Sequence, residues 1–108
     1  MENQSGTDPK IIAIISYLTF IGWIVALVLN SSKKAEFASF HIRQSLGIIL
    51  LFVAGNIVGR LPLIGWAAIA VYIFAFVLWI LGLLAAINNE EKPVPVLGEQ
   101  FQQWFRSI

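Results

Sequence analysis

The side chains best suited to chemistry lie in one short stretch, Phe-His-Ile-Arg-Gln-Ser at residues 40–45, where a long apolar segment begins. On a helix, His41, Gln44 and Ser45 share a face because they are three and four residues apart. With Arg43 beside them, they form a candidate notch for a lipid headgroup or a partner protein at the membrane surface. The alternative is that these four side chains only anchor the helix at the interface.

Arg43 is the charged member of this notch, and its position favours a nearby anion. It would lie close to the positive end of its helix dipole, where a cation is unfavourable unless a negative group is near. A lipid phosphate is one candidate. Glu90 and Glu91 are the others, because the end of the last apolar segment should return to the same side. We therefore name both as candidate ion-pair partners of Arg43.

The chain lacks the residue sets that most enzymes and metal sites need. It has no cysteine and a single histidine, which disfavours thiolate chemistry and a metal site of ordinary ligand count. No GxGxxG, Walker or HExxH pattern occurs. Ser45 follows His41 by four residues, but one serine and one histidine at an interface are weak support for a hydrolase. We expect no catalysis, no metal and no cofactor.

The composition indicates a membrane protein. Hydrophobic residues make up 58% of the chain and charged residues only 12%, whereas soluble proteins carry about 25% charged residues. A small soluble protein could not cover its surface with so few polar groups. The net charge of +1 gives no basic surface for nucleic acid. None of the six acidic residues falls inside an apolar run, which disfavours a proton-coupled transporter.

Three apolar runs are candidates for membrane-spanning helices. The run 11–29 would form a helix about 28 Å long, which matches the hydrocarbon core of about 30 Å. The polar start of the chain is unlike a secretory signal, so we expect this run to be retained. The run at 37–59 is short unless it begins near Phe37, and the run at 62–87 is longer than one span requires. The predicted fold is all-α: an integral membrane bundle of three transmembrane helices plus a C-terminal amphipathic interfacial helix. Its parts are a polar tail (1–10), a transmembrane domain (11–92; spans at about 11–29, 37–59 and 62–87) and a Pro-containing linker with the amphipathic helix (93–108).

The predicted C-terminal helix gathers its apolar side chains on one side. Leu97, Phe101, Trp104 and Phe105 recur at helical spacing, and polar residues lie opposite. Such a helix suits the membrane interface, where it would lie flat. The alternative is that it docks onto the loops of the bundle, since either arrangement would bury the same side chains.

Small residues mark the faces along which the helices should pack. Helices in lipid associate through small residues, and the pair Gly55 and Gly59 forms a GxxxG motif. A bundle within one chain accounts for these faces, and a homo-oligomer is the alternative. Asn56 would need an interhelical hydrogen bond, because hydrocarbon offers no partner. The predicted packing face comprises Gly47, Gly55, Asn56, Gly59, Ala68, Ala75 and Gly82.

The distribution of basic residues predicts an orientation. With three spans, Lys10 and Arg60 would share one side of the membrane. Lys33, Lys34, Arg43, Lys92 and Arg106 would share the other side. By the positive-inside rule, the amino terminus is expected outside and the carboxyl terminus in the cytoplasm.

Several stretches of the chain also resemble a known family. The stretch at 40–45, together with residues 15–18, 85–88 and 92–98, is similar to the Tic-twenty-like small bacterial membrane proteins, relatives of a chloroplast inner-envelope import component. In that family the FHxRQ stretch begins the second helix. The resemblance implies a bacterial inner-membrane location. The chloroplast relatives are linked to a protein-conducting channel and have four spans, so a channel formed by one copy of this chain is not expected.

These observations favour a non-enzymatic inner-membrane module. It would act by association with membrane lipids, with itself as a homo-oligomer, or with other envelope membrane proteins. The alternative is a subunit of an oligomeric translocation or conductance pore, in which several copies enclose a path lined by Asn56 and the polar residues of the first apolar run.

Overall fold

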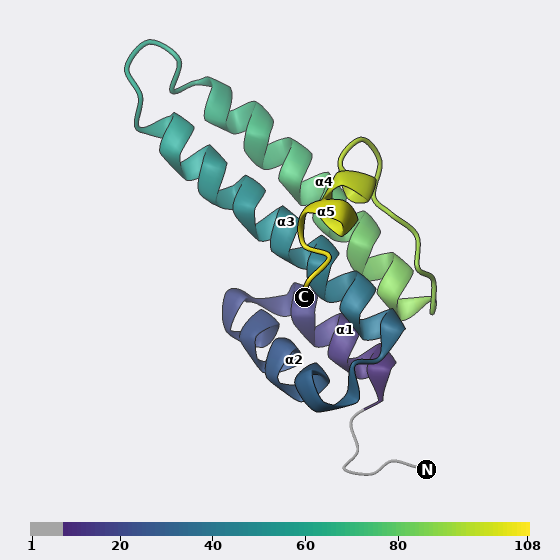
Figure 1. Ribbon diagram of the computed structural model, residues 1–108. Coiled ribbons are helices and arrows are strands. Elements are labelled where there is room, and N and C mark those ends of the chain that lie inside the picture. Colours follow the sequence, from purple (N-terminus) through teal and green to yellow (C-terminus); the bar gives the residue numbers. More distant parts are fainter. Residues whose placement is uncertain (1–7) are drawn as a thin grey trace.

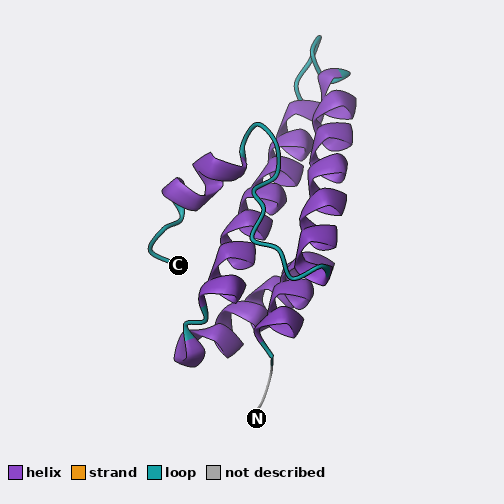
Figure 2. Cartoon of the chain, turned by 90° about the vertical axis from the view of Figure 1, so that its right-hand side faces the viewer, coloured by secondary structure: helices purple, strands orange, loops and turns teal. Residues whose placement is uncertain are grey.

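The computed structural model describes residues 8–108, which form five helices and no strand (Figure 1). Two long helices run antiparallel, and a hairpin of two shorter helices packs beside one end of this pair. The last helix lies across one flank of α3 (Figure 2). The helices are α1 (Pro9–Leu18), α2 (Phe20–Lys33), α3 (Glu36–Gly59), α4 (Ala67–Ile87) and α5 (Gly98–Trp104).

The long helices α3 and α4 are, among the described residues, the two that are long and apolar enough to cross a membrane. They contain 24 and 21 residues, which at 1.5 Å per residue gives about 36 and 31 Å. The start of α3 lies within one residue of the predicted range 37–59. In contrast, α4 begins five residues later than the predicted range 62–87, because turns occupy residues 60–66. The third apolar run therefore contains a helix of matched length after a turn, not one overlong helix.

The first apolar run does not form one span. Thr19 is extended, with φ −154°, and separates α1 from α2, whose first turn it caps by accepting a hydrogen bond from the Gly22 amide at 2.9 Å. The carbonyl of Tyr17 accepts instead from the indole of Trp79 on α4. With 10 and 14 residues, α1 and α2 are about 15 and 21 Å long, short of the hydrocarbon core. The prediction of one continuous helix over 11–29 was wrong, and the structure offers two candidate spans where three were expected.

The hydrophobic core lies where the hairpin meets the long helices. In one cluster, Tyr17 of α1 packs with Ile48 of α3, Leu78 of α4 and Phe101 of α5. In a second, residues of α1 and α2 pack against Ala38 and Ile42 of α3. The Trp23 indole also donates a hydrogen bond to the Ile42 carbonyl at 2.9 Å. The hairpin is therefore held to α3 along its length by both apolar and polar contacts.

Glycines along α3 and α4 allow close approach between helices of the same chain. A Cβ built on Gly55 would lie 2.8 Å from the ring of Tyr72, and one on Gly82 would lie 2.6 Å from the ring of Tyr17. At Gly47 a Cβ would collide with the ring of Phe101. These contacts leave no room for side chains. The glycines thus serve packing within the chain.

The other members of the predicted packing face divide into two groups. Ala68 and Ala75 of α4 are buried, and Ala68 lies beside Gly59 of α3. Gly59 and Asn56 are exposed near the far end of α3. The Asn56 carbonyl oxygen accepts a hydrogen bond from Arg60 Nε at 3.1 Å, one turn along the chain. The interhelical hydrogen bond expected for Asn56 is replaced by one with its own neighbour.

The C-terminal helix docks on the bundle through one residue of its apolar side. Phe101 is buried against Gly47 of α3, whereas the Trp104 side chain is 64% exposed. Leu97 and Phe105 are half-buried at the edges of the contact. Of the two arrangements considered for this helix, docking onto the bundle accounts for the burial of Phe101. The contact is with α3 itself and not with a loop.

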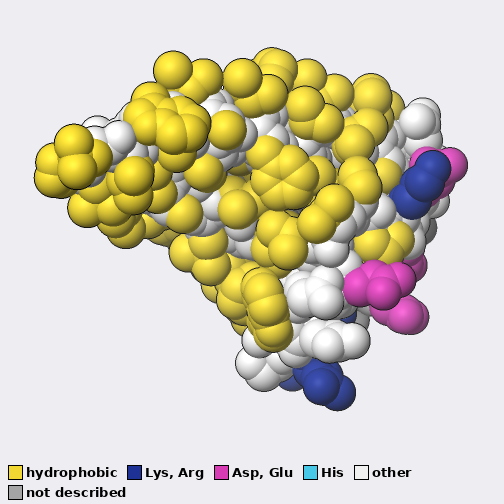
Figure 3. Space-filling view, turned by 90° about the horizontal axis from the view of Figure 1, so that it is seen from above, with side chains coloured by type: hydrophobic (Ala, Val, Ile, Leu, Met, Phe, Trp, Pro, Cys, Tyr) yellow, Lys and Arg dark blue, Asp and Glu magenta, His cyan; other side chains and the backbone are white. Residues whose placement is uncertain are grey.

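The surface separates into apolar and polar regions. Figure 3 shows hydrophobic side chains across most of one face, with Lys, Arg, Asp and Glu at its right and lower edges. Large apolar side chains stay exposed along α4, among them Ile69 at 65% and Ile73 at 60%. A contiguous apolar surface of this kind marks contact with a membrane or a partner.

Candidate functional site

The buried histidine of the predicted notch is held by two hydrogen bonds. Its Nδ1 lies 2.7 Å from the Tyr17 hydroxyl, and its Nε2 lies 2.7 Å from the Glu90 main-chain oxygen. Because a carbonyl can only accept, Nε2 carries a proton. The Tyr17 hydroxyl accepts from Gln44 Nε2 at 2.9 Å, so its own proton is free to be donated to Nδ1. The three side chains thus form a directed chain from Gln44 through Tyr17 to a neutral His41.

Gln44 extends this chain to the segment after α4. Its Oε1 accepts a hydrogen bond from the Val94 amide at 2.8 Å. We call Tyr17, His41, Gln44 and the main-chain groups of Glu90 and Val94 the polar junction. The His41 and Gln44 side chains have no exposed surface. The junction therefore connects α1, α3 and the segment that follows α4, and its hydrogen bonds are made within the protein.

The four residues of the predicted notch are not gathered into one recess. His41 and Gln44 belong to the polar junction, and Ser45 is buried with its hydroxyl donating to the Ile42 carbonyl at 3.1 Å. Arg43 lies on another side of α3, beneath the C-terminal segment. Arg43 lines the pocket of about 640 Å³, whereas Ser45 lines a different, mainly apolar one of about 340 Å³.

The contacts of Arg43 differ from the ion pairs expected for it. Its two terminal nitrogens donate to Gln102 Oε1 at 3.4 Å and to the Arg106 carbonyl at 3.3 Å, and both acceptors are neutral. The candidate partner Glu90 contributes its main-chain oxygen to His41 instead, and the Glu91 side chain is exposed. The guanidinium of Arg43 thus connects α3 to the C-terminal segment without a carboxylate among its hydrogen-bond partners in residues 8–108.

Sequence reasoning missed two members of this region. Tyr17 lies in an apolar run, 24 residues before His41, and its type at a buried position was the one available signal, since a buried hydroxyl needs a partner. Gln102 was not among the residues singled out from the sequence. Its amide donates to the Phe40 carbonyl at 2.8 Å, which ties the C-terminal helix to the start of α3.

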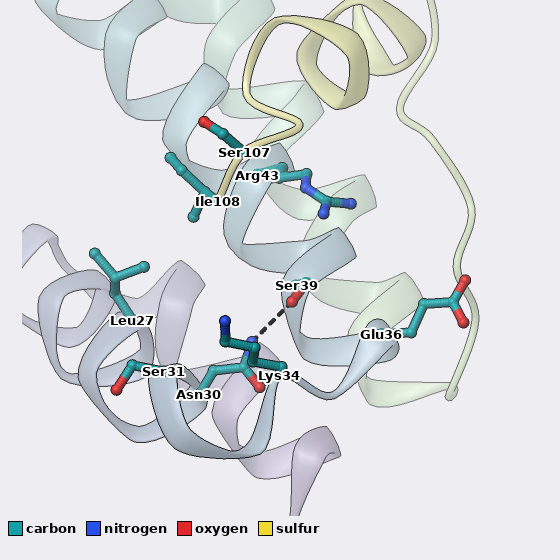
Figure 4. A pocket seen from close by; sticks show the side chains of 9 residues that line it. All are labelled: Leu27, Asn30, Ser31, Lys34, Glu36, Ser39, Arg43, Ser107 and Ile108. Carbon is teal, nitrogen blue, oxygen red and sulfur yellow. Dashed lines mark hydrogen bonds between the residues drawn. The ribbon is translucent and has the colours of Figure 1, made fainter.

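Three of the described cavities adjoin this part of the fold. One, of about 640 Å³, lies between the end of α2, the first turns of α3 and the C-terminal segment (Figure 4). A second, of about 340 Å³, is mainly apolar and lies between the hairpin tip at residues 18–20 and the long helices. A third, of about 420 Å³, lies at the end of α4 and the segment that follows it, where Glu90 and Val94 contribute to its lining. Across residues 8–108, no group of three or more His, Cys, Asp or Glu side chains is placed to hold a metal ion.

Comparison with known proteins assigns the family. Residues 8–100 match the MamF/MmsF family, described as the magnetosome magnetite crystal formation protein family. The chain belongs to this family. A relative described as a UPF0132 membrane protein of Methanocaldococcus jannaschii is 33% identical over 106 residues, which covers 95% of this chain and 74% of the relative. No solved structure matches the chain.

Membership of the MamF/MmsF family corrects the resemblance drawn from the sequence. The Tic-twenty-like assignment was wrong, because the matched range includes the FHxRQ stretch and nearly all of the apolar helices on which it rested. Apolar helices resemble one another across unrelated membrane proteins, so the distinctive part of the likeness was only a few residues long. The family and the relative agree with a membrane protein, and neither description names an enzyme.

Proposed function

We propose that this chain is a non-enzymatic integral membrane module that acts by association with membrane lipids and with other membrane proteins. The observation that carries the proposal is the exposed apolar surface along α4, set against charged side chains at one end of the molecule (Figure 3). Such a surface is stable in lipid or against a partner helix, and costly in water. For the process named in the family description, magnetite crystal formation, a module of this kind would act through the membrane.

The polar junction gives this module a fixed shape. It holds the hairpin and the segment after α4 to the same part of α3. The hairpin covers one end of the α3–α4 pair (Figure 1). The other end carries exposed apolar side chains on both helices. That uncovered end is the part of the module available to lipid or to a partner helix.

The hairpin also leads us to a different orientation from the one predicted. Because α1 and α2 form a hairpin and do not cross as one span, the start of α1 lies at the same end of the α3–α4 pair as the end of α4 (Figure 1). Of the seven Lys and Arg residues, Arg60 alone belongs to the loop between α3 and α4. By the positive-inside rule, we propose that both ends of the described chain face the cytoplasm and that the Arg60 loop faces outward.

Single cysteines test the membrane insertion and the orientation together. The natural chain has no cysteine, so Lys34→Cys, Leu63→Cys and Ser107→Cys each report one position. With a membrane-impermeant maleimide on intact cells, we expect labelling at residue 63, and labelling at 34 and 107 only after permeabilisation. Extraction of the chain by alkaline carbonate, or labelling of all three positions from outside, would contradict the proposal.

The pore alternative has less support from the geometry. It required Asn56 to line a path between copies of the chain. Asn56 is exposed, but its oxygen is already bonded to Arg60 on the same helix. We therefore propose association and not conductance as the activity of the module.

A further inference from the structure

The largest of these three cavities has the lining of an anion site. It opens where α2 ends and α3 begins, and it has a volume of about 640 Å³. Figure 4 shows side chains from α2, α3 and the C-terminal segment arranged around it. We call it the polar pocket; it is lined by Leu27, Asn30, Ser31, Lys34, Glu36, Ser39, Arg43, Ser107 and Ile108.

Two cations line the polar pocket. Lys34, the C-cap residue that directly follows α2, has a left-handed backbone with φ 50°, and its exposed side chain lies at the pocket. Arg43 lines the pocket from α3, one helical turn beyond Ser39. Its Nε is buried and has no hydrogen-bond partner among the described residues. Its other nitrogens make long bonds to neutral oxygens. A guanidinium in this state gains from an anionic acceptor more than a solvated one would.

Buried polar side chains supply further donors. The Ser39 side chain is 8% exposed and accepts a hydrogen bond from Asn30 Nδ2 at 2.8 Å, so its own hydroxyl proton can be donated to a ligand. Asn30 is itself held in place, because its Oδ1 accepts from the Ala35 amide at 3.0 Å. Ser39 is thus fixed between Lys34 and Arg43 with its hydroxyl at the pocket.

The first turn of α3 adds to the positive potential. Ala35, which precedes the helix, has no side-chain oxygen to cap it, and the start of a long helix favours a negative group. Glu36 is the one acidic side chain in the lining. Figure 4 shows its carboxylate directed away from Lys34 and Ser39. The side chains that face the pocket from α2 and α3 therefore favour an anion.

We propose that the polar pocket binds a phosphate group, held by Lys34, Ser39 and Arg43. The cavity is wider than a lone phosphate requires, and apolar Leu27 and Ile108 lie on its wall, so the headgroup and glycerol of an anionic phospholipid fit its lining. A free phosphate ion would use the same donors. That the phosphate belongs to a lipid rests on the proposed membrane location of the protein. That the pocket binds a phosphate group rests on the geometry of the pocket alone.

Lipid retention by the purified full chain tests this proposal. The protein is exchanged into micelles that contain equal amounts of phosphatidylglycerol and phosphatidylcholine, and retained lipid is measured by native mass spectrometry. We expect the wild type to retain the anionic lipid preferentially. Arg43→Gln should weaken this binding about tenfold or more, since charge-assisted hydrogen bonds are lost. Lys34→Gln should weaken it about threefold, because that side chain is exposed.

Matched variants separate the pocket from general charge effects. Arg60→Gln removes one positive charge at the far end of α3 and should leave retention unchanged. Arg43→Lys keeps the charge and should preserve most of the binding, which guards against loss of fold. Equal retention by wild type, Arg43→Gln and Arg60→Gln, together with no response to phosphate, would overturn the proposal, as would an equal loss in both Gln variants.

A second arm distinguishes the source of the phosphate. In zwitterionic micelles, the thermal unfolding of the chain is compared in inorganic phosphate and in chloride at equal ionic strength. Stabilisation by phosphate that is lost in Arg43→Gln identifies a free-ion site, and lipid retention without this stabilisation identifies a lipid site. Carbonate extraction of the same variants reports on membrane insertion separately, so failure of the membrane proposal and failure of the pocket can be told apart.

Discussion

Removal of the Tyr17 hydroxyl tests the polar junction with the smallest change the chain offers. In Tyr17→Phe, the ring that packs against Gly82 keeps its shape. The change removes the acceptor of Gln44 Nε2 and the donor to His41 Nδ1. Both groups are fully buried, so water cannot replace the lost partner without opening the core.

The expected magnitude follows from these two orphaned groups. Leaving a buried donor or acceptor unsatisfied costs about 1–2 kcal/mol at a membrane-protein site. Two such groups lower the free energy of unfolding by about 2–4 kcal/mol. The Tyr17 ring remains buried in the variant, so the loss of apolar contact should be small.

The measurement is unfolding of the purified protein in detergent micelles, with helix content followed by circular dichroism as a denaturing detergent is added. Tyr72→Phe is the matched control, because the Tyr72 side chain is 37% exposed on α4 and its hydroxyl loss should change stability by less than about 0.5 kcal/mol. A double-mutant cycle with Gln44→Leu should show that the two losses are not additive. If Tyr17→Phe is as stable as Tyr72→Phe, the junction does not stabilise the fold as described.

The remaining predictions concern the packing of the last helix and the break in the first apolar run. Gly47→Ala should displace Phe101 and destabilise the protein by about 1–3 kcal/mol through overpacking, and proteolysis of the C-terminal segment should accelerate. The added change Phe101→Ala should restore part of the lost stability. Absence of this rescue would argue against the contact between Gly47 and Phe101. Thr19→Ala removes the cap of α2 and should cost about 1 kcal/mol, measured by the same unfolding assay. Thr19→Ser, which keeps the hydroxyl, should retain most of the stability, and equal effects of both substitutions would contradict the capping role.

The two long helices could be predicted from the sequence because their signal is local. Uncharged apolar runs of sufficient length predict spans whatever the rest of the chain does. The break at Thr19 has a weaker signal, since threonine is common within apolar runs and only its capping preference marks a helix start. Within the run 11–29, the length matched one membrane span, and this agreement concealed two short helices. The indole of Trp79 donates a hydrogen bond to the carbonyl of Tyr17 from 62 residues away, so no local sequence pattern can predict this contact.

The candidate site was predicted in part, because helical spacing is also a local signal. Helical spacing correctly placed His41 and Gln44 on one face of α3, where both meet the Tyr17 hydroxyl. Spacing could not show that another helix already covers that face. The ion pair expected between Arg43 and Glu90 assumed that charge decides the contact, whereas the Glu90 carbonyl is what meets α3. Every residue has a main-chain carbonyl, so the residue types in the sequence do not indicate which carbonyl will accept a hydrogen bond.

The polar junction also constrains the order in which the protein can be completed during synthesis. The Val94 amide lies 50 residues after Gln44, its hydrogen-bond partner, and Glu90 lies 49 residues after His41. At about 5–20 residues per second, a ribosome needs about 3–10 s to cover that interval. Throughout this time the nascent α3 holds an imidazole and an amide without their final acceptor and donor. The segment at residues 90–94 therefore completes the polar junction, and a ribosome that stops before residue 90 leaves both side chains open to water or to the insertion machinery.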